Sequence, residues 1–282
     1  MSHREKIDSV LKRLAVVSEE NRKYFGKHTV MVPSRNEVIE IIKRIQCLIF
    51  PSYFSYDKDS GKSQMEIAEI VFASLKRQLT SAYSFFDEDC LVDTESVAYE
   101  IMDRIPYVKE MLLKDVIALY EGDPAARSAE EIILSYPGFY AISIYRLAHE
   151  LYVKGVPYLP RLMTEYAHEK TGIDIHAGAT IGEYFFIDHG TGIVIGETTT
   201  IGDRVKIYQG VTLGAKSFEL DEDGNPIKGI KRHPDIGNDC VIYANATILG
   251  GNTKIGDGCT IGGNVWLTHS VPAGETVYYN GK

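Results

Sequence analysis

Apolar residues follow two different periods in the two parts of this chain. Up to about residue 170 they recur three and four positions apart, which is the spacing of one face of an α-helix. From about residue 173 aliphatic residues recur every six positions, and this period fits neither a helix nor a hairpin sheet. The pattern predicts an α+β chain in two parts, with an α-helical domain at residues 1–170 and a repetitive β-domain at residues 171–282.

Several amphipathic stretches predict helices in the first part, at residues 38–49, 65–79, 97–105, 108–120 and 140–153. Ser34 and Glu37 have the spacing of a capping box at the start of the first helix, and Pro51 should end that helix. Thr94 can cap the third, and Pro106 should bend or end it. The simplest interpretation of these apolar stripes is that they pack into a core.

The six-residue repeat is long enough to predict a β-solenoid. Its aliphatic positions are interrupted by a two-residue slip, a gap and one extra residue: 175, 181, 187, 193; 195, 201, 207, 213; 236, 242, 248; 255, 261, 267. A small or β-branched residue often follows four positions later. An aliphatic side chain at every sixth residue can point inward and stack on its equivalent in the next coil, while the small residue fits near a corner. The period alone does not give the handedness, and parallel crossovers are in general right-handed.

The repeat breaks once, between Gly214 and Ile236. The segment at about 215–235 is acidic and rich in turn residues, and it returns on the sequence Arg232-His233-Pro234. Within a solenoid such an insertion must leave the stack as a loop, and loops of this kind often lie beside binding sites. A tolerated surface insertion is the alternative.

Three histidines of the repeat region are candidates for chemistry: His176, His189 and His233. Each on its own could be an ordinary surface histidine. Asp174 and His189 are fifteen residues apart, close to one turn of three hexads, so we expect the two side chains to face each other across adjacent coils. A carboxylate on one imidazole nitrogen fixes the tautomer and leaves the other nitrogen free to act as a base.

Composition and charge exclude several classes of function. Of the 282 residues 44% are hydrophobic and the formal net charge is −9, without a basic block, so neither nucleic acid nor an anionic membrane is an expected partner. The first twenty residues are charged throughout and lack the apolar core of a signal peptide, and no apolar stretch approaches the length of a membrane span. Four cysteines without C-x-x-C spacing suggest neither zinc binding nor disulfides. We therefore expect a cytoplasmic protein.

Four strings of the second part closely resemble the serine O-acetyltransferases, a family of hexapeptide-repeat acyltransferases. They are residues 172–182 (GIDIHAGATIG), 188–198 (DHGTGIVIGET), 209–214 (QGVTLG) and 232–234 (RHP). The resemblance covers the whole solenoid and extends more loosely upstream, to Asp123-Pro124-Ala125. It implies a left-handed parallel β-helix with triangular coils, against the general preference for right-handed crossovers. It also implies a homotrimer or a dimer of trimers, with acetyl-CoA in the groove between neighbouring solenoids.

The resemblance implies a role for each matching residue. His189 matches the general base that takes the proton of the L-serine hydroxyl, and Asp174 matches the carboxylate that orients this base. Asp123 and Asp188 match acidic groups near the substrate ammonium. The transfer is direct, so neither an acyl-enzyme nor a metal is required.

A further pair of matches, Arg232 and His233, would hold the substrate carboxylate. An amino-acid zwitterion needs an acidic group on one side and a cationic group on the other, which supports these assignments. Ala215, Ala244 and Gly262 occupy positions where relatives contact CoA through the backbone. This chain has Gly214-Ala215 and a longer acidic loop where many relatives have Gly-Gly and a short loop.

The C-terminal residues, Asn280 to Lys282, lack the tail ending in Ile that docks many relatives into O-acetylserine sulfhydrylase. We therefore do not expect a sulfhydrylase complex through this C-terminus.

Three alternatives remain open from the sequence. One is another hexapeptide acyltransferase that acts on a sugar, an antibiotic or homoserine. Another is a hydratase resembling the γ-class carbonic anhydrases, with His176, His189 and His233 as zinc ligands. The last is a scaffold protein without enzymatic activity, which would give no reason for an Asp174–His189 pair.

Overall fold

The computed structural model describes residues 2–14, 16, 31–87 and 89–279. A series of helices occupies the first part: α1 (His3–Leu14), α3 (Arg35–Ile49), α4 (Gln64–Phe86), α5 (Thr94–Gly122), α6 (Ala129–Ser135), α7 (Pro137–Val153) and α8 (Leu159–Thr171). A short 3-10 turn, η1 (Asp57–Asp59), lies between α3 and α4. The predicted change from helix to strand is confirmed, since α8 ends at Thr171 and the first strand begins at Asp174.

The predicted cap of the first core helix is only half of a capping box. The Ser34 side chain accepts a hydrogen bond from the backbone N–H of Glu37, as expected, and α3 ends at Ile49 ahead of Pro51. The Glu37 carboxylate, however, bonds to Arg77 and Gln78 on α4. Tertiary contact with the neighbouring helix has therefore taken the group that would otherwise close the box. A complete box, which the sequence analysis missed, starts α4 at Ser63 and Glu66.

Two predictions about the helices are wrong, the break between the third and the fourth and the cap at Thr94. The stretches at 97–105 and 108–120 belong to a single helix, α5, which runs through Pro106, and its N-cap is Asp93 rather than Thr94. Buried Val108 and Leu112 follow the proline directly and hold the second half of the helix against the core. Packing of this kind can outweigh the hydrogen bond that a proline removes.

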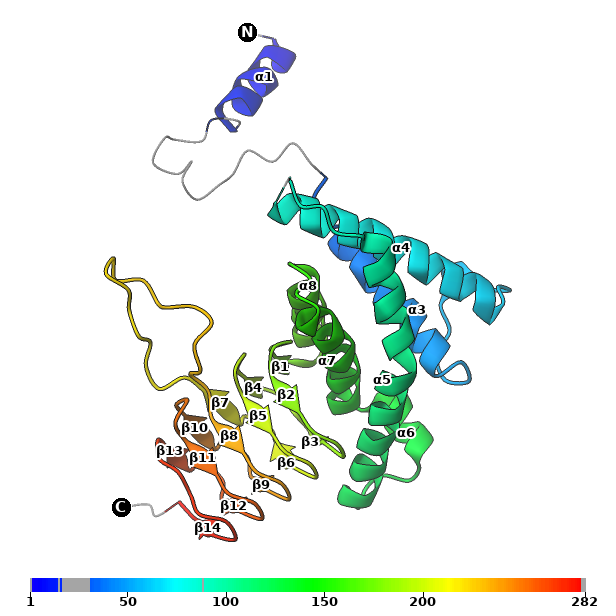
Figure 1. Ribbon diagram of the computed structural model, residues 1–282. Coiled ribbons are helices and arrows are strands. Elements are labelled where there is room, and N and C mark those ends of the chain that lie inside the picture. Colours follow the sequence, from blue (N-terminus) through cyan, green and yellow to red (C-terminus); the bar gives the residue numbers. More distant parts are fainter. Residues whose placement is uncertain (1, 15, 17–30, 88, 280–282) are drawn as a thin grey trace.

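The second part is the predicted solenoid, a left-handed parallel β-helix. Its strands are short: β1 (Asp174–Ile175), β2 (Thr180–Ile181), β3 (Phe186–Asp188), β4 (Val194–Ile195), β5 (Thr200–Ile201), β6 (Lys206–Tyr208), β7 (Thr212–Gly214), β8 (Asp235–Ile236), β9 (Val241–Ile242), β10 (Thr247–Leu249), β11 (Lys254–Ile255), β12 (Thr260–Ile261), β13 (Trp266–Leu267) and β14 (Thr276–Val277). They stack as flat ladders below the helices (Figure 1).

Three parallel sheets form the faces of the solenoid. Sheet A is β1-β4-β7-β10-β13, sheet B is β2-β5-β8-β11 and sheet C is β3-β6-β9-β12-β14. The chain visits them in the order A, B, C in each coil, so each coil has an A/B, a B/C and a C/A corner. The fourteen aliphatic residues of the repeat are all buried, which confirms that they point inward.

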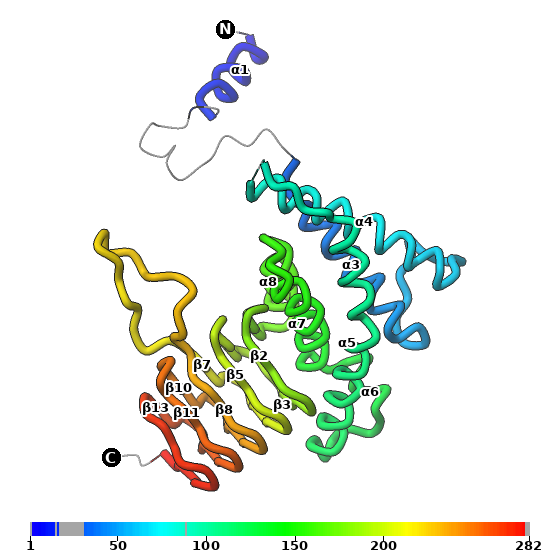
Figure 2. Tube along the Cα trace, in the orientation of Figure 1, coloured from blue at the N-terminus to red at the C-terminus, as the bar shows by residue number. Residues whose placement is uncertain are grey.

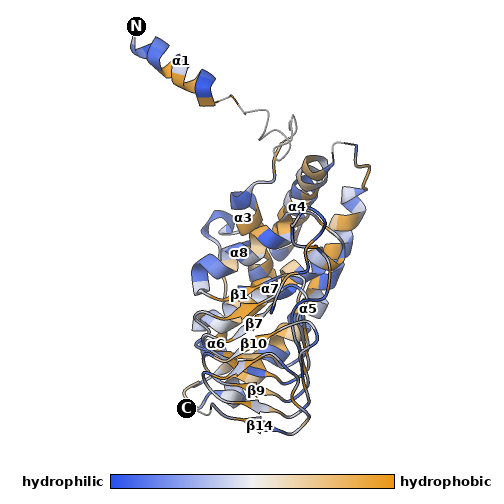
Figure 3. Ribbon diagram, turned by 90° about the vertical axis from the view of Figure 1, so that its left-hand side faces the viewer, coloured by the Kyte–Doolittle hydropathy of each residue, from blue (hydrophilic) through white to orange (hydrophobic). Residues whose placement is uncertain are grey.

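The helices are joined to the solenoid by one continuous apolar core. Phe185 and Phe186 of the first coil are buried, and α5, α7 and α8 all contact that coil. Asp115 of α5 and Arg146 of α7 form a buried ion pair at this junction, and Arg146 also donates to the carbonyl oxygen of Gly182. Figure 3 shows the stacked coils continuing directly from the helices that cover them.

The insertion leaves the stack as predicted. β7 ends at Gly214 and β8 begins at Asp235, and the chain between them projects as a long arm, yellow to orange in Figure 2. A single antiparallel bridge between Leu220 and Pro226 closes its tip. Among the helices that the structure describes, none combines the length and the apolar character required to cross a bilayer.

Candidate active site

His189 projects from an enlarged C/A corner. Asp188 ends β3, and His189 follows it with a φ of 55°, a left-handed conformation that costs a residue with a side chain about 1–3 kcal/mol. The first coil is longer than the next here, because Asp174 pairs with Val194 whereas Val194 pairs with Thr212. The two-residue slip seen in the sequence therefore falls at this corner. It leaves the His189 side chain 71% exposed, with Nε2 at 3.6 Å from Asp188 Oδ1.

Asp123 lies at the end of α5 and is fixed from two sides. One carboxylate oxygen, Oδ1, accepts a hydrogen bond from the Ala125 N–H at 2.8 Å, and Oδ2 accepts one from the Tyr136 hydroxyl at 2.6 Å. The preceding residue must be glycine, because a Cβ on Gly122 would lie 2.6 Å from the ring of Phe186. The close approach of α5 to the first coil therefore delivers Asp123 to the solenoid.

Asp123 and Asp188 share an electrostatic environment. Their charges act on the same neighbour, Tyr136, whose pKa is raised to about 12 by the hydrogen bond to Asp123, by burial and by surrounding carboxylates. Both charges also act on Tyr208, whose pKa is raised mainly by burial. Tyr208 lies beside Asp188 in the sheet C register, and its ring stacks on that of Tyr243 at 5.2 Å. The two acidic residues predicted to attract an ammonium group are thus brought to one place.

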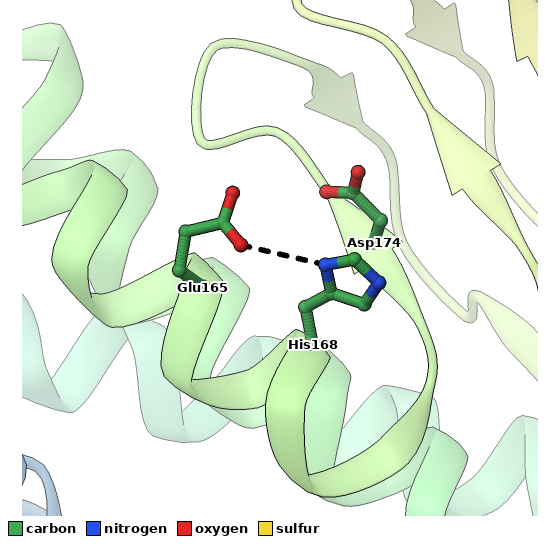
Figure 4. Close-up of side chains that lie close together, drawn as sticks. All are labelled: Glu165, His168 and Asp174. Atoms are coloured by element: carbon green, nitrogen blue, oxygen red, sulfur yellow. Dashed lines mark hydrogen bonds and ion pairs between the residues drawn. The ribbon is translucent and has the colours of Figure 1, made fainter.

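Asp174 lies on β1, which packs against the corner that carries His189. Asp174 pairs with Val194 in sheet A, and the corner of His189, which comes before Val194, meets the residue before Asp174, since a Cβ on Gly190 would lie 2.5 Å from Ile173. The fifteen-residue spacing falls short of the twenty-residue first coil. The Asp174 carboxylate also lies beside Glu165 and His168 of α8, as Figure 4 shows. The role of Asp174 as the orienting carboxylate stays a prediction.

The residues around Asp174 have the spacing of metal ligands. Donor atoms of Glu165, His168 and Asp174 all lie within 4.8 Å of one another, and His168 Nδ1 is 3.4 Å from Glu165. The Glu165 carboxylate also pairs with Arg161 at 2.5 Å. A cation at that distance opposes a metal, and the three side chains are only half-buried, so the cluster has no clear need for one.

A second polar group lies at the A/B corner. Arg232 forms an ion pair with Glu197, and the other oxygen of Glu197 accepts a hydrogen bond from the Tyr152 hydroxyl at 3.0 Å. Burial raises the pKa of Glu197, but the bonds from Arg232 and Tyr152 outweigh burial and hold the pKa below its usual value. Glu197 therefore stays charged and orients the guanidinium. Glu197 belongs to the string at residues 188–198, and nothing in the sequence pattern predicts this role for it.

His233 is held as a neutral hydrogen-bond donor. Its Nδ1 accepts a bond from the Thr198 N–H at 3.0 Å, so the ring proton is on Nε2. Burial and the nearby charge of Arg232 lower its pKa to about 4. Gly196 makes this position possible, because a Cβ there would lie 2.1 Å from the ring. The glycine that follows Ile195 therefore leaves the room that the His233 imidazole occupies.

The three histidines do not gather in one chain. His176 and His233 both belong to the A/B corner, whereas His189 belongs to the C/A corner. His176 Nδ1 accepts a bond from the Gly178 N–H at 3.0 Å, and burial lowers its pKa. Among the described residues the Glu165 cluster is the one group with metal-ligand spacing, and it contains none of the three. The zinc-site alternative therefore has no support from the geometry of a single chain.

The residues expected to contact CoA are likewise divided between two corners. Ala215 follows β7 at the A/B corner, where the arm begins, whereas Ala244 and Gly262 follow strands of sheet C. The Gly262 N–H is already engaged, since it donates to the Val277 carbonyl at 2.7 Å. A contact of this residue with CoA would have to use a different atom. The cofactor contacts stay predictions.

The site residues therefore form two groups, one at each of the two solenoid corners that flank sheet A. Asp123, Asp188 and His189 lie at the C/A edge, and Arg232 and His233 lie at the A/B edge. A small zwitterion cannot touch both groups of one chain if the width of a sheet separates them.

Comparison with known proteins gives a consistent result. No family model matches the chain. It is 62% identical over 173 residues to a plasmid-encoded serine acetyltransferase of Synechococcus elongatus, an alignment that covers 61% of this chain and 54% of that protein. It is 45% identical over 180 residues to the serine acetyltransferase of Bacillus subtilis, covering 61% of this chain and 78% of that protein. The chain thus spans about half the length of the first relative and most of the second.

Solved structures extend the similarity to the helical part. The crystal structure of serine acetyltransferase 1 from Entamoeba histolytica matches with a TM-score of 0.74 and 35% identity, over 90% of both chains. The Neisseria gonorrhoeae serine acetyltransferase, crystallised with serine, matches with a TM-score of 0.58 and 27% identity, over 86% of this chain and 96% of that one.

Proposed function

The chain belongs to the serine acetyltransferase family, and we propose that it transfers the acetyl group of acetyl-CoA to the hydroxyl of L-serine. The products are O-acetyl-L-serine and CoA, and this reaction is the first step from serine to cysteine. The observation that carries the proposal is the exposed His189 beside Asp188 at the enlarged C/A corner, together with the fixed carboxylate of Asp123, which acts on the same tyrosine as Asp188.

Charge supports an amino acid as the acceptor. Asp123 and Asp188 supply negative charge for an ammonium group, and Arg232 with the Nε2–H of His233 supplies donors for a carboxylate. Since these groups lie on opposite edges of sheet A, we propose that the site forms between two copies of the chain. A homotrimer of solenoids, single or paired into a hexamer, would set the C/A corner of one copy against the A/B corner of the next.

The reaction requires two proton transfers, one from the serine hydroxyl to a base and one from that base to the leaving thiolate. In the proposed mechanism a ring nitrogen of His189 takes the hydroxyl proton of serine while the oxygen attacks the acetyl carbonyl carbon of the thioester. The C–S bond then breaks, and the protonated imidazole returns the proton to the leaving thiolate of CoA. Asp174 orients the imidazole, and backbone amides near Ala215 and Ala244 stabilise the oxyanion. No step needs a metal or an acyl-enzyme.

The carboxylate of the substrate has to share Arg232 with Glu197. The guanidinium donates Nη2–H to Glu197 and Nη1–H to the Ile230 carbonyl oxygen at 3.4 Å, and each of these nitrogens keeps a second hydrogen for a ligand. The cation therefore stays at the corner where the substrate carboxylate is proposed to bind.

The proposed reaction also has a co-substrate and a cellular location. Acetyl-CoA is the co-substrate, and the reaction takes place in the cytoplasm, where both substrates are made. Nucleic acid and membrane are not partners, and no complex with the sulfhydrylase through the C-terminus is proposed. Residues 280–282, on which that last prediction depends, lie outside the described residues.

The direct experiment is release of the CoA thiol, followed with a thiol reagent. The full-length protein should release CoA from acetyl-CoA when L-serine is added. Homoserine and glucosamine should give a much lower kcat/KM. Faster turnover of the amino sugar would assign the chain to the other hexapeptide acyltransferases, and no turnover of any acceptor would favour a scaffold.

A further inference from the structure

We propose that Tyr136 is a positioning residue for the substrate ammonium, which it holds in place through Asp123. This inference rests on the proposed function, in which Asp123 contacts the amino group of serine. The hydroxyl of Tyr136 is not placed to react with the substrate itself. Its task is to fix the carboxylate that does contact the substrate.

The geometry starts from the position of Tyr136 at a helix boundary. It ends α6 and is the N-cap of α7, and Pro137 at the first position of α7 fixes the chain direction there. From this rigid junction the hydroxyl donates to Asp123 Oδ2 at 2.6 Å, a short distance typical of a bond to a charged acceptor. The ring is half-buried, so the side chain has little freedom to move elsewhere.

The second oxygen of Asp123 completes the arrangement. Oδ1 accepts the N–H of Ala125, so the carboxylate cannot rotate without losing one of two bonds. Asp123 itself lies outside the helix, since α5 ends at Gly122. The residue is thus at the start of a turn and depends on side-chain contacts for its orientation. A tyrosine hydroxyl is suited to this position, because it donates a hydrogen bond without adding a cation that would repel ammonium.

The surrounding charges make the choice of a neutral donor important. The hydrogen bond to Asp123, burial and the charges of nearby carboxylates raise the pKa of Tyr136 to about 12, so the proton stays on the phenol at neutral pH. The Lys206 amine lies close to Gly122 and over the Phe186 ring, and among the described residues it forms no ion pair with Asp123 or Asp188. The carboxylates therefore keep their negative charge for the ligand.

The test is Tyr136→Phe, which removes the hydroxyl and keeps the ring. We expect the KM for L-serine to rise about tenfold or more, the size of a lost hydrogen bond to a charged group. The kcat and the KM for acetyl-CoA should stay close to those of the wild type. The matched control is Tyr140→Phe, which removes a hydroxyl one turn further along α7 that pairs with Tyr166 and lies outside the proposed site.

Two inhibitors separate positioning from a general structural effect. L-Alanine keeps the ammonium and carboxylate of serine, and its inhibition constant should rise by the same factor in Tyr136→Phe. L-Lactate lacks the ammonium, and its inhibition constant should not change. In an Asp123→Asn background the tyrosine substitution should add little, because the two residues act as one unit.

The outcomes distinguish this inference from the proposed function. If the wild type turns over serine and Tyr136→Phe has an unchanged KM, or lactate and alanine weaken equally, the positioning role is wrong and the function stands. If the wild type does not turn over serine, the proposed function is wrong, and alanine binding by calorimetry then shows whether an ammonium site exists. A lowered thermal midpoint shared by Tyr136→Phe and the control would assign Tyr136 to stability alone.

Discussion

Substitution of Asp115 by asparagine tests how the helices are held on the solenoid. The Asp115 side chain is fully buried and that of Arg146 is 6% exposed. The carboxylate accepts two bonds from Arg146, at 2.6 and 2.8 Å, and a third from the Phe185 N–H at 2.9 Å. Arg146 also reaches the carbonyl oxygens of Ile181 and Gly182 in the first coil.

The magnitude follows from leaving one charge without its partner. Asparagine can still accept the Phe185 N–H, but its amide cannot neutralise the guanidinium of Arg146. Removing one member of a buried ion pair typically costs about 3–5 kcal/mol. For a chain of this size that corresponds to a fall of about 6–20 °C in the midpoint of thermal unfolding. We expect Asp115→Asn to lose stability in this range.

The matched control is an ion pair of the same geometry on the surface. Arg204 and Asp239 are joined by two bonds of 2.6 and 2.8 Å, but their side chains are 54% and 52% exposed. Exposed pairs contribute about 0–1 kcal/mol, so Asp239→Asn should be nearly silent. Asparagine also tolerates the φ of 57° at this position.

Urea unfolding at a fixed protein concentration, followed by circular dichroism, measures both variants, since subunit association shifts apparent stability. Equal losses in the two variants would refute the argument from burial. A loss below about 1 kcal/mol in Asp115→Asn would mean that the carboxyl is already uncharged in the folded protein.

Three further predictions concern the site. His189→Ala should lower kcat by about 10²–10⁴-fold without changing the mass of the assembly by light scattering, and near-normal turnover would remove its role as base. Arg232→Ala should mainly raise the KM for serine in the CoA-release assay, whereas an unchanged KM would place the substrate carboxylate elsewhere. His233, with its pKa lowered from 6.5 to about 4, should stay neutral with the proton on Nε2 at pH 5 in ¹⁵N NMR of the ring. The neutral His233 should contribute its full stabilisation above about pH 6.5, and this contribution should fall as the pH approaches 4, because only the unfolded chain then takes up the proton. Urea midpoints that do not fall over this pH range would contradict the prediction.

Much of the architecture could be predicted from local pattern. The hexad of inward aliphatic residues depends only on spacing, and all fourteen members proved to be buried. Helix ends that depend on one residue, such as Ser34 at the start of α3, were also predictable. Two predictions failed because contacts with distant parts of the chain determine the local structure. Pro106 lies inside α5, and Glu37 bonds to α4 and not to the cap of its own helix.

The candidate site, like the fold, could be predicted only in part. The sequence determined which residues could carry the chemistry, because Asp188-His189 and Arg232-His233 lie where the six-residue repeat contains extra residues or is interrupted. It could not determine their neighbours. A repeat counted in hexads puts Asp174 opposite His189, but Asp174 pairs with Val194 across a first coil of twenty residues, two more than the next, and its carboxylate also lies beside Glu165 and His168 of α8.

Only the tertiary structure decided which side chains hold the site residues in place. Tyr136 reaches Asp123, and Glu197 reaches Arg232, across segments that no periodic pattern relates. The sequence fixes a period through the size and polarity of single residues, which is a local property. The contacts of a corner depend instead on the length of each coil and on how closely a helix approaches it, and these emerge only when the whole chain is packed.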